Sequence, residues 1–211
     1  MNKRLLLATL PFLLLPTGCG ADDADPTSAS ERSAEPSSPP VGLAGHVVPA
    51  DGLPGFTSDS ETRRLSLASF AEEHDKTVAE LRRSGMVAAA SMVFEPSTKR
   101  QGFGLSVAAE FATEKQAEAE ADRLFAANSE PEEGSTVAPL QVPAIPGAQA
   151  VTFTGSDGGL SFIGVEIVFT DGLVMHEIFA MGEAPVLDVA DVMAAATALY
   201  ERVAGRPLDD A

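Results

Sequence analysis

The chain has few of the residues that cross-link small exported domains through disulfides or that form common catalytic centres. Its 211 residues include one Cys, no Trp, one Tyr and three His. A single Cys excludes an internal disulfide, and neither a second Cys nor a His-Glu-x-x-His run is present to form a zinc site. The Gly-x-Ser-x-Gly turn of serine hydrolases is also missing. We therefore predict no catalytic residue, no metal and no cofactor, and we interpret His46, His74 and His176 as satisfied or surface side chains.

Basic residues are scarce as well. The chain has 14 Lys and Arg against 31 Asp and Glu, a formal net charge of −17. Such a surface gains nothing from counterion release on nucleic acid and is not attracted to anionic lipid headgroups. This excludes nucleic acid as a partner. Solubility is the simplest role for the acidic charge, and binding of a basic partner is the alternative.

The first 19 residues resemble a bacterial lipoprotein signal peptide with its lipobox. Two basic residues precede an apolar run from Leu5 to Leu15, and Pro16-Thr17-Gly18 leads to Cys19. A charged start, a short apolar core and small residues at the cut are typical of secretory signals, and this core is too short to span a bilayer. The resemblance implies that residues 1–18 are removed between Gly18 and Cys19.

The same resemblance implies lipidation of Cys19. In the family, the thiol carries a diacylglyceryl group and the new amino terminus carries a further acyl chain such as palmitate. More than one chain is needed for stable anchoring, because a single chain binds membranes only marginally. The expected location is the outer face of the cytoplasmic membrane. Pro16 stands where the family usually has Leu, so an ordinary secretory signal with an incidental Cys remains the alternative.

Residues 19–45 are predicted to form a lipidated, disordered tether, and residues 46–211 a single folded domain. The tether is rich in Pro, Ser and Asp and has few large apolar residues, so it cannot bury enough surface to offset chain entropy. Its acids lack the spacing and the turn glycine of a calcium loop. Beyond residue 18, no stretch approaches the length of a transmembrane helix.

The domain is predicted to be α+β, with a mainly antiparallel five-stranded sheet and about three helices. Helices are expected over 66–83, 113–127 and 187–204, and strands over 87–95, 103–111, 150–154, 160–170 and 173–181. Ser69 with Glu72 and Thr113 with Gln116 have capping-box spacing. Asp171-Gly172 has the composition of a two-residue hairpin turn. Residues 128–147 form a proline-rich loop to which we assign no role.

Small residues on one side of two strands predict an apolar groove. Gly104 and Ala108 alternate with large residues in one strand, and Gly164 occupies a similar place in another. The hypothesis is that these three residues line a groove for a lipid or a partner's side chain. The alternative is that helices pack closely on this side, or that it faces water.

Glu166 and Glu177 can face each other across the last hairpin. Paired carboxylates are the machinery of glycoside hydrolysis. Sugar-cleaving sites also tend to offer aromatic platforms, and this chain has no Trp and one Tyr. We therefore favour surface acids on neighbouring strands over a catalytic pair.

The layout resembles that of many small actinobacterial lipoproteins without an assigned activity, which implies a tethered α+β domain and no particular chemistry. We predict a non-catalytic envelope lipoprotein that binds a protein or a small apolar ligand. The alternative is an extracytoplasmic enzyme, a hydrolase with dispersed catalytic residues. A buried acid or histidine with a shifted pKa in a cleft would favour the enzyme, whereas an apolar groove would favour binding.

Overall fold

The computed structural model describes residues 42–59, 61–74, 76–98, 101–131, 134–157, 160–183 and 187–204. All of them belong to one compact unit. The predicted signal peptide, Cys19 and the predicted tether up to residue 41 lie outside the described residues.

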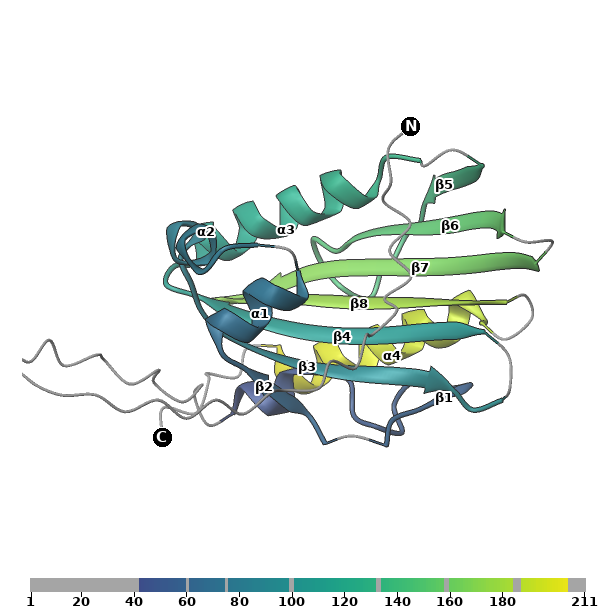
Figure 1. The fold of residues 1–211 in the computed structure, drawn as a ribbon, viewed down its shortest axis with the longest axis horizontal. Coiled ribbons are helices and arrows are strands. Elements are labelled where there is room, and N and C mark those ends of the chain that lie inside the picture. The colour runs from purple at the N-terminus through teal and green to yellow at the C-terminus, as the bar shows by residue number, and fades with distance from the viewer. Residues whose placement is uncertain are drawn as a thin grey trace, which may run out of the picture. The chain divides into compact units, whose positions relative to one another are not determined.

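One antiparallel sheet forms the frame of the domain (Figure 1). Its strands lie in the spatial order β1-β3-β4-β8-β7-β6-β5, and β2 pairs with β3 beside this path. The strands are β1 Phe56–Thr57, β2 Arg63–Leu65, β3 Met86–Pro96, β4 Gly102–Phe111, β5 Ser135–Pro139, β6 Gln149–Asp157, β7 Leu160–Asp171 and β8 Val174–Glu183. The helices are the 3-10 helix η1 Leu43–His46 and the α-helices α1 Leu67–Glu73, α2 Val78–Ser84, α3 Glu114–Asn128 and α4 Val189–Val203. The predicted mixed class with an antiparallel sheet is confirmed.

The predicted five strands and three helices were too few. The additional strands β1, β2 and β5 are two to five residues long, too short for an alternating pattern to reveal them. The predicted helix 66–83 is two helices. Ser66 caps α1, and Thr77 begins α2 in a capping box with Glu80. The capping box predicted at Ser69 and Glu72 is therefore wrong.

Two other local predictions can be compared with the backbone. Thr113 does cap α3, since its side chain accepts a hydrogen bond from the Gln116 N–H. Asp171, however, pairs with Val174 in the ladder. The two-residue turn is therefore Gly172-Leu173 rather than Asp171-Gly172, and Gly172 has the positive φ of 57° that this turn requires.

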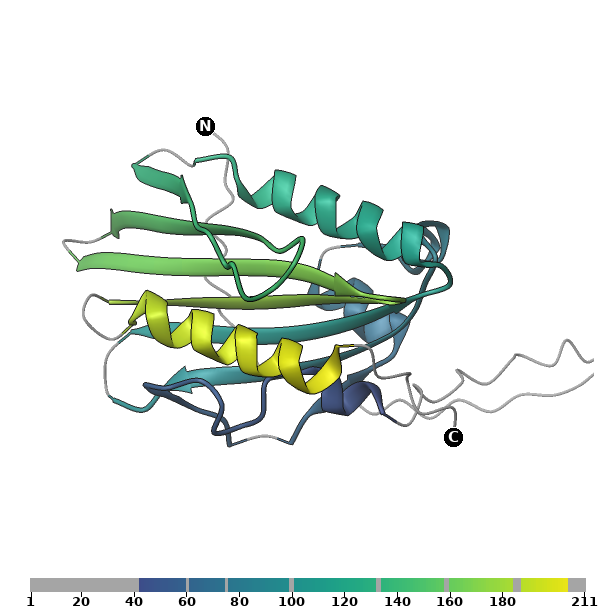
Figure 2. The same ribbon diagram turned by 180° about the vertical axis from the view of Figure 1, so that it is seen from behind.

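One face of the sheet is covered by α4 and by the segment around η1 (Figure 2). Leu43 is 1% exposed in this core, so the packed chain begins before the predicted boundary at residue 46. The Val48 N–H donates to Ser106 Oγ at 3.0 Å. Arg202 of α4 donates to the Val47 carbonyl at 2.6 Å. These two bonds hold the first described segment against both the sheet and α4.

The histidines have structural surroundings. His176 Nδ1 lies 3.0 Å from the His46 carbonyl, and its ring stacks on Phe169 at 4.5 Å. Burial lowers the pKa of His176 to about 3, so its ring is neutral at pH 7. His74 ends α1 and stacks on Phe70 at 4.1 Å. Among the described residues, no group of three or more His, Cys, Asp and Glu is arranged to hold a metal ion.

The other face is covered over only part of its length. Helices α1, α2 and α3 lie over the left-hand part of the sheet in Figure 1, where they enclose a second core around Phe70, Leu81 and Phe111. No described helix lies over the right-hand ends of β4, β8, β7 and β6. Among the described helices, none has both the length and the apolar composition to cross a membrane.

Candidate functional site

The uncovered half of the sheet presents an apolar surface, which we call the open face. The ladder pairs Phe103 with Met181 and Leu105 with Phe179, and Gly164 with both Met181 and Phe153, so these side chains share one side of the sheet. The open face consists of Phe103, Leu105, Phe153, Leu160, Phe162, Gly164, Phe179 and Met181. Phe103 is 40%, Leu160 42% and Met181 36% exposed. The other large side chains of the open face are half-buried.

Gly164 and Gly155 leave space for the rings of Phe153 and Phe162 to pack against the backbone of the open face. A Cβ at Gly164 would be 3.1 Å from Cδ2 of Phe153, and a Cβ at Gly155 would overlap the ring of Phe162. The Phe179 ring centre is 6.2 Å from that of Phe153 and 6.4 Å from that of Phe103. These separations are typical of aromatic contacts. The rings of Phe103, Phe179 and Phe153 therefore form a continuous apolar layer on the open face.

Two buried glutamates, Glu166 and Glu177, lie where the open face meets the helices, and we call them the acid pair. Glu166 pairs with Phe179, and Glu177 pairs with Val168, so both carboxyls project from the same side as Phe179, at neighbouring diagonal positions. Glu166 is 0% and Glu177 9% exposed. The prediction of surface acids is wrong because α3, with its packed side chains, encloses this part of the hairpin.

The two glutamates lack a basic partner of their own. Asn128 Nδ2 at the end of α3 donates to Glu166 Oε1 at 2.7 Å, while Glu166 Oε2 is buried without a hydrogen-bond partner among the described residues. Burial raises the pKa of Glu166 to about 7. Burial and then the charge of Glu166 raise the pKa of Glu177 to about 8. Glu177 is therefore mainly protonated at pH 7, and Glu166 partly so.

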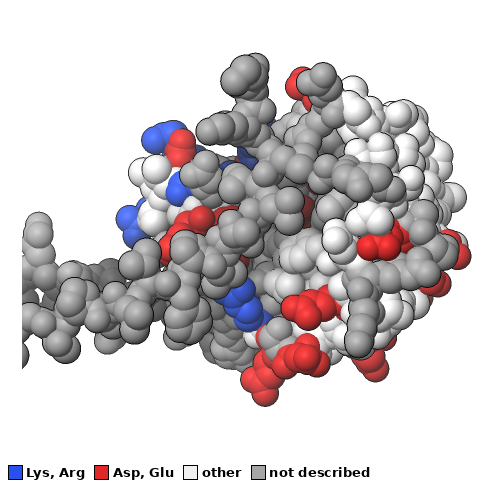
Figure 3. Space-filling view, turned by 45° about the vertical axis from the view of Figure 1, so that its right-hand side comes forward, with Lys and Arg blue, Asp and Glu red and all other residues white. Residues whose placement is uncertain are grey.

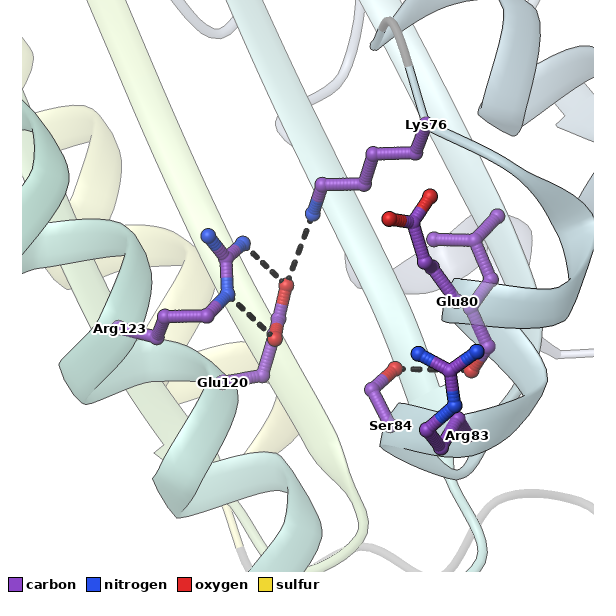
Figure 4. A pocket seen from close by; sticks show the side chains of 7 residues that line it. Lys76, Glu80, Arg83, Ser84, Glu120 and Arg123 are labelled. Carbon is purple, nitrogen blue, oxygen red and sulfur yellow. Dashed lines mark hydrogen bonds and ion pairs between the residues drawn. The ribbon is translucent and has the colours of Figure 1, made fainter.

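An ion-pair cluster stands beside the acid pair (Figure 4). Glu120 of α3 is 7% exposed and accepts from Lys76 Nζ at 3.0 Å and from Arg123 Nε at 2.8 Å. Burial alone raises the pKa of Glu120, but the hydrogen bonds from Arg123 and Lys76 outweigh it and hold the pKa below its ordinary value. The charge of Lys76 also acts to lower the pKa of Glu177. Lys76 therefore forms an ion pair with Glu120 and acts on Glu177 only through its charge, without a hydrogen bond.

A cleft of about 410 Å³ lies between α2 and α3 at this cluster. Figure 4 shows side chains from both helices pointing into it. It is lined by Lys76, Glu80, Leu81, Arg83, Ser84, Glu120 and Arg123. Glu80 is engaged in the Thr77 cap, and the Ser84 hydroxyl donates to the Leu81 carbonyl. The polar groups of Glu80 and Ser84 in this cleft are therefore already hydrogen-bonded within α2 and its cap.

Figure 3 shows basic and acidic side chains together on its left-hand side, a basic group near the lower middle, and acidic side chains over the lower and right-hand parts. A second hollow of about 480 Å³ lies at the outer ends of β5, β6 and β7, and of its lining residues Phe162 belongs to the open face whereas Ile163 points to the α4 side. Its remaining lining is small or hydroxylic, with no charged side chain.

The predicted groove residues are not brought together. Gly104 and Ala108 lie on the α4 side, where Ala108 is 0% exposed and a Cβ at Gly104 would be 3.0 Å from Leu53. Gly164 lies on the opposite side, in the open face. The side of β4 that carries Gly104 and Ala108 is filled by close packing against the α4 side of the domain. The side that carries Phe103 and Leu105 is the one that no described helix covers at these first residues of the strand.

The acid pair was accessible to sequence reasoning in part. Glu166 interrupts an otherwise apolar stretch from Leu160 to Phe169 in which Ser161 and Gly164 are the other exceptions. An acid in so apolar a strand is a signal of a buried or functional carboxyl. The partner Asn128 is 38 residues away, and no local pattern indicates it.

Comparison with known proteins gives little further information. No protein-family model and no curated protein matches the chain. Among solved structures, the extracellular domain of PknH from Mycobacterium tuberculosis is similar over 70% of this chain and 80% of that chain, with 12% identity and a TM-score of 0.46. A likeness at this level carries no information about function.

Proposed function

We propose that the protein is a non-catalytic binding module and that the open face is its binding surface. One observation carries this proposal. Of the five large hydrophobic side chains that are exposed among the described residues, three belong to the open face: Phe103, Leu160 and Met181. Together with the half-buried rings beside them they make a contiguous apolar surface, and such surfaces on soluble domains typically mark binding sites. The expected ligand has an apolar part that covers several of these rings.

We further propose that a lipid on Cys19 holds the module on the outer face of the cytoplasmic membrane. The support is the resemblance of residues 1–19 to a lipoprotein signal. The segment between Cys19 and residue 42 could span about 70 Å if fully extended as polyproline. An anchored module of this kind can bind ligands at some distance from the membrane surface.

The binding proposal is tested with an uncharged hydrophobic dye, Nile red, whose fluorescence reports transfer from water to an apolar site. We expect wild-type protein to bind it, and Phe103→Ser and Met181→Ser to weaken binding by about tenfold each. Leu173→Ser is the matched control, because Leu173 is 38% exposed in the β7–β8 turn, away from the open face. Equal losses in all three variants, or no binding by the wild type, would contradict the proposal.

A hydrolase is the second candidate, and the acid pair is the observation that favours it. A carboxyl that keeps its proton at neutral pH can serve as a general acid, and the pKa of Glu177 is raised to about 8. Binding is favoured over catalysis because the surface exposed beside the pair is apolar, and neither described cleft brings a further polar group to the two carboxyls. Turnover of p-nitrophenyl esters or glycosides that Glu177→Gln abolishes would favour the hydrolase.

A further inference from the structure

We propose that the ligand of the open face is a cationic amphiphile, a small molecule with an apolar chain and one primary or secondary ammonium group held by Glu166 and Glu177. This inference rests on the proposed function, since the apolar chain must lie on the open face. It adds the chemical class of the headgroup.

Charge is the first line of support. The described residues of β3, β4, β7 and β8 place four acids on this side of the sheet and no basic residue. Arg63 of β2 lies on the same side, opposite Ser91, and is paired with Glu73. Glu95 and Glu183 lie toward the outer end of the open face, which no described helix covers. Glu166 and Glu177 lie at its inner end, where α3 begins to cover the sheet beside the aromatic rings. An apolar surface bounded by acids at both ends attracts a ligand that combines an apolar body with a positive charge.

The second line of support is a buried carboxylate oxygen that lacks a hydrogen-bond donor. Glu166 is 0% exposed, and its Oε2 has no hydrogen-bond partner among the described residues, while Oε1 is taken by Asn128. A buried acceptor without a donor is destabilising. A primary ammonium group carries three donors and no acceptor. It could therefore satisfy Glu166 Oε2 and still donate to Glu177 on the neighbouring strand.

The groups that surround the pair do not supply this charge themselves. From the connection between α1 and α2, Lys76 acts on Glu177, but its Nζ is bonded to Glu120 at 3.0 Å. From α3, Asn128 is neutral, Glu120 is an acid, and the guanidinium of Arg123 is bonded to Glu120. From the strands, the paired neighbours are Phe179 and Val151 for Glu166, and Val168 and Val107 for Glu177, all of them uncharged. The Phe179 ring adjoins both acids in the ladder and can add a cation–π contact with a bound ammonium.

The test compares amphiphiles with the same decyl chain and different headgroups, by titration calorimetry at pH 7.5 and low salt, below their micelle concentrations. We expect decylammonium to bind about tenfold more tightly than decyl maltoside, and decyl sulfate to bind most weakly. Decyltrimethylammonium should bind more weakly than decylammonium, because it has charge but no N–H donor. Decylammonium affinity should increase from pH 6 to pH 8, as the two carboxyls lose their protons.

Two isosteric variants locate the headgroup. Glu166→Gln and Glu177→Gln should each weaken decylammonium binding by about tenfold and leave decyl maltoside binding within about twofold. Glu95→Gln is the matched control, since it removes the same charge from the exposed outer end of this side. Thermal unfolding establishes that the variants fold, which we expect because both native carboxyls are protonated to a large extent at neutral pH.

The outcomes separate this inference from the proposed function. If decylammonium and decyl maltoside bind equally well and the Gln variants change neither, the open face binds apolar ligands and the ammonium site is overturned. Tightest binding of decyl sulfate overturns it as well. If no decyl amphiphile and no Nile red binds, both proposals fail.

Discussion

Glu166 and Glu177 occupy diagonal positions on neighbouring antiparallel strands, one opposite Phe179 and the other opposite Val168. On an exposed sheet such a pair would repel weakly and cost little. Here the two side chains are 0% and 9% exposed, next to an aromatic surface. Buried acids without a base are unfavourable for folding, and proteins tend to retain such features where function requires them.

Stability should depend on pH through this pair, and Glu177→Gln should reduce the dependence. The native pKa of Glu177 is about 8, against an ordinary value of 4.5. Between these values the unfolded state binds fewer protons than the native state, so the free energy of unfolding falls as pH rises. Each unit of pKa difference corresponds to about 1.4 kcal/mol. Urea unfolding at pH 5, 6.5 and 8 should show a smaller decline for Glu177→Gln than for wild type.

The control for this experiment is Glu95→Gln at the exposed outer end of the same side. It should retain the wild-type decline. A decline in Glu177→Gln as large as that of the wild type would contradict the burial of this carboxyl.

Ala108→Trp should destabilise the fold strongly, because Ala108 is 0% exposed in the core beneath α4. Overpacking of a filled core costs about 1–3 kcal/mol and occasionally more. Leu160→Trp, at a position 42% exposed on the open face, should change the free energy of unfolding little. The measurement is the denaturant midpoint of each variant. A wild-type midpoint for Ala108→Trp would mean that the space around this residue is not filled.

Ser106→Ala should cost about 1–3 kcal/mol, since it removes the acceptor of the buried Val48 N–H. Ser106 is 0% exposed, so water cannot replace the lost hydroxyl without rearrangement. Ser156→Ala, at an exposed position in β6, is the control and should have no measurable effect. Faster amide exchange at Val48 in Ser106→Ala would identify the lost bond directly, and unchanged exchange would argue against it.

Glu120→Gln should loosen the contact between the α1–α2 connection and α3. It removes the carboxylate that joins Lys76 and Arg123, and we expect a loss of about 1 kcal/mol because both cations are partly exposed. The pKa of Glu120 is lowered, so this contribution is present above pH 4.5 and is lost as pH falls through the native pKa. Glu118→Gln, exposed on the same helix, is the control. Equal stability of the two variants at pH 7 would contradict a stabilising ion pair.

Cys19→Ala should abolish membrane anchoring. If the thiol carries the lipid, the variant protein should leave the membrane for the medium or remain as an unprocessed precursor. Detergent phase partitioning and the mass of the mature amino terminus measure this. Identical partitioning of the variant and the wild type would show that the chain is held by something other than a lipid on Cys19.

The sequence by itself determined the mixed class, the long antiparallel strands and the helices α3 and α4. These elements carry their pattern within one continuous segment. The alternation from Phe103 to Phe111 predicts a strand, and the cap at Thr113 predicts where α3 begins. Short strands such as β2, and the break between α1 and α2, escaped prediction because too few residues express the pattern.

Only the tertiary structure decided which side of each strand is filled. Alternation separates Phe103 from Gly104, but it does not say which of the two faces a helix. The packing of α4 and the η1 segment on the small side, and of α1 to α3 over only part of the other, depends on segments far away in the chain. The same holds for Glu166, whose partner Asn128 is 38 residues away. Burial and pKa follow from such long-range contacts, and for that reason the acid pair could be placed on one hairpin from the sequence but not recognised as buried.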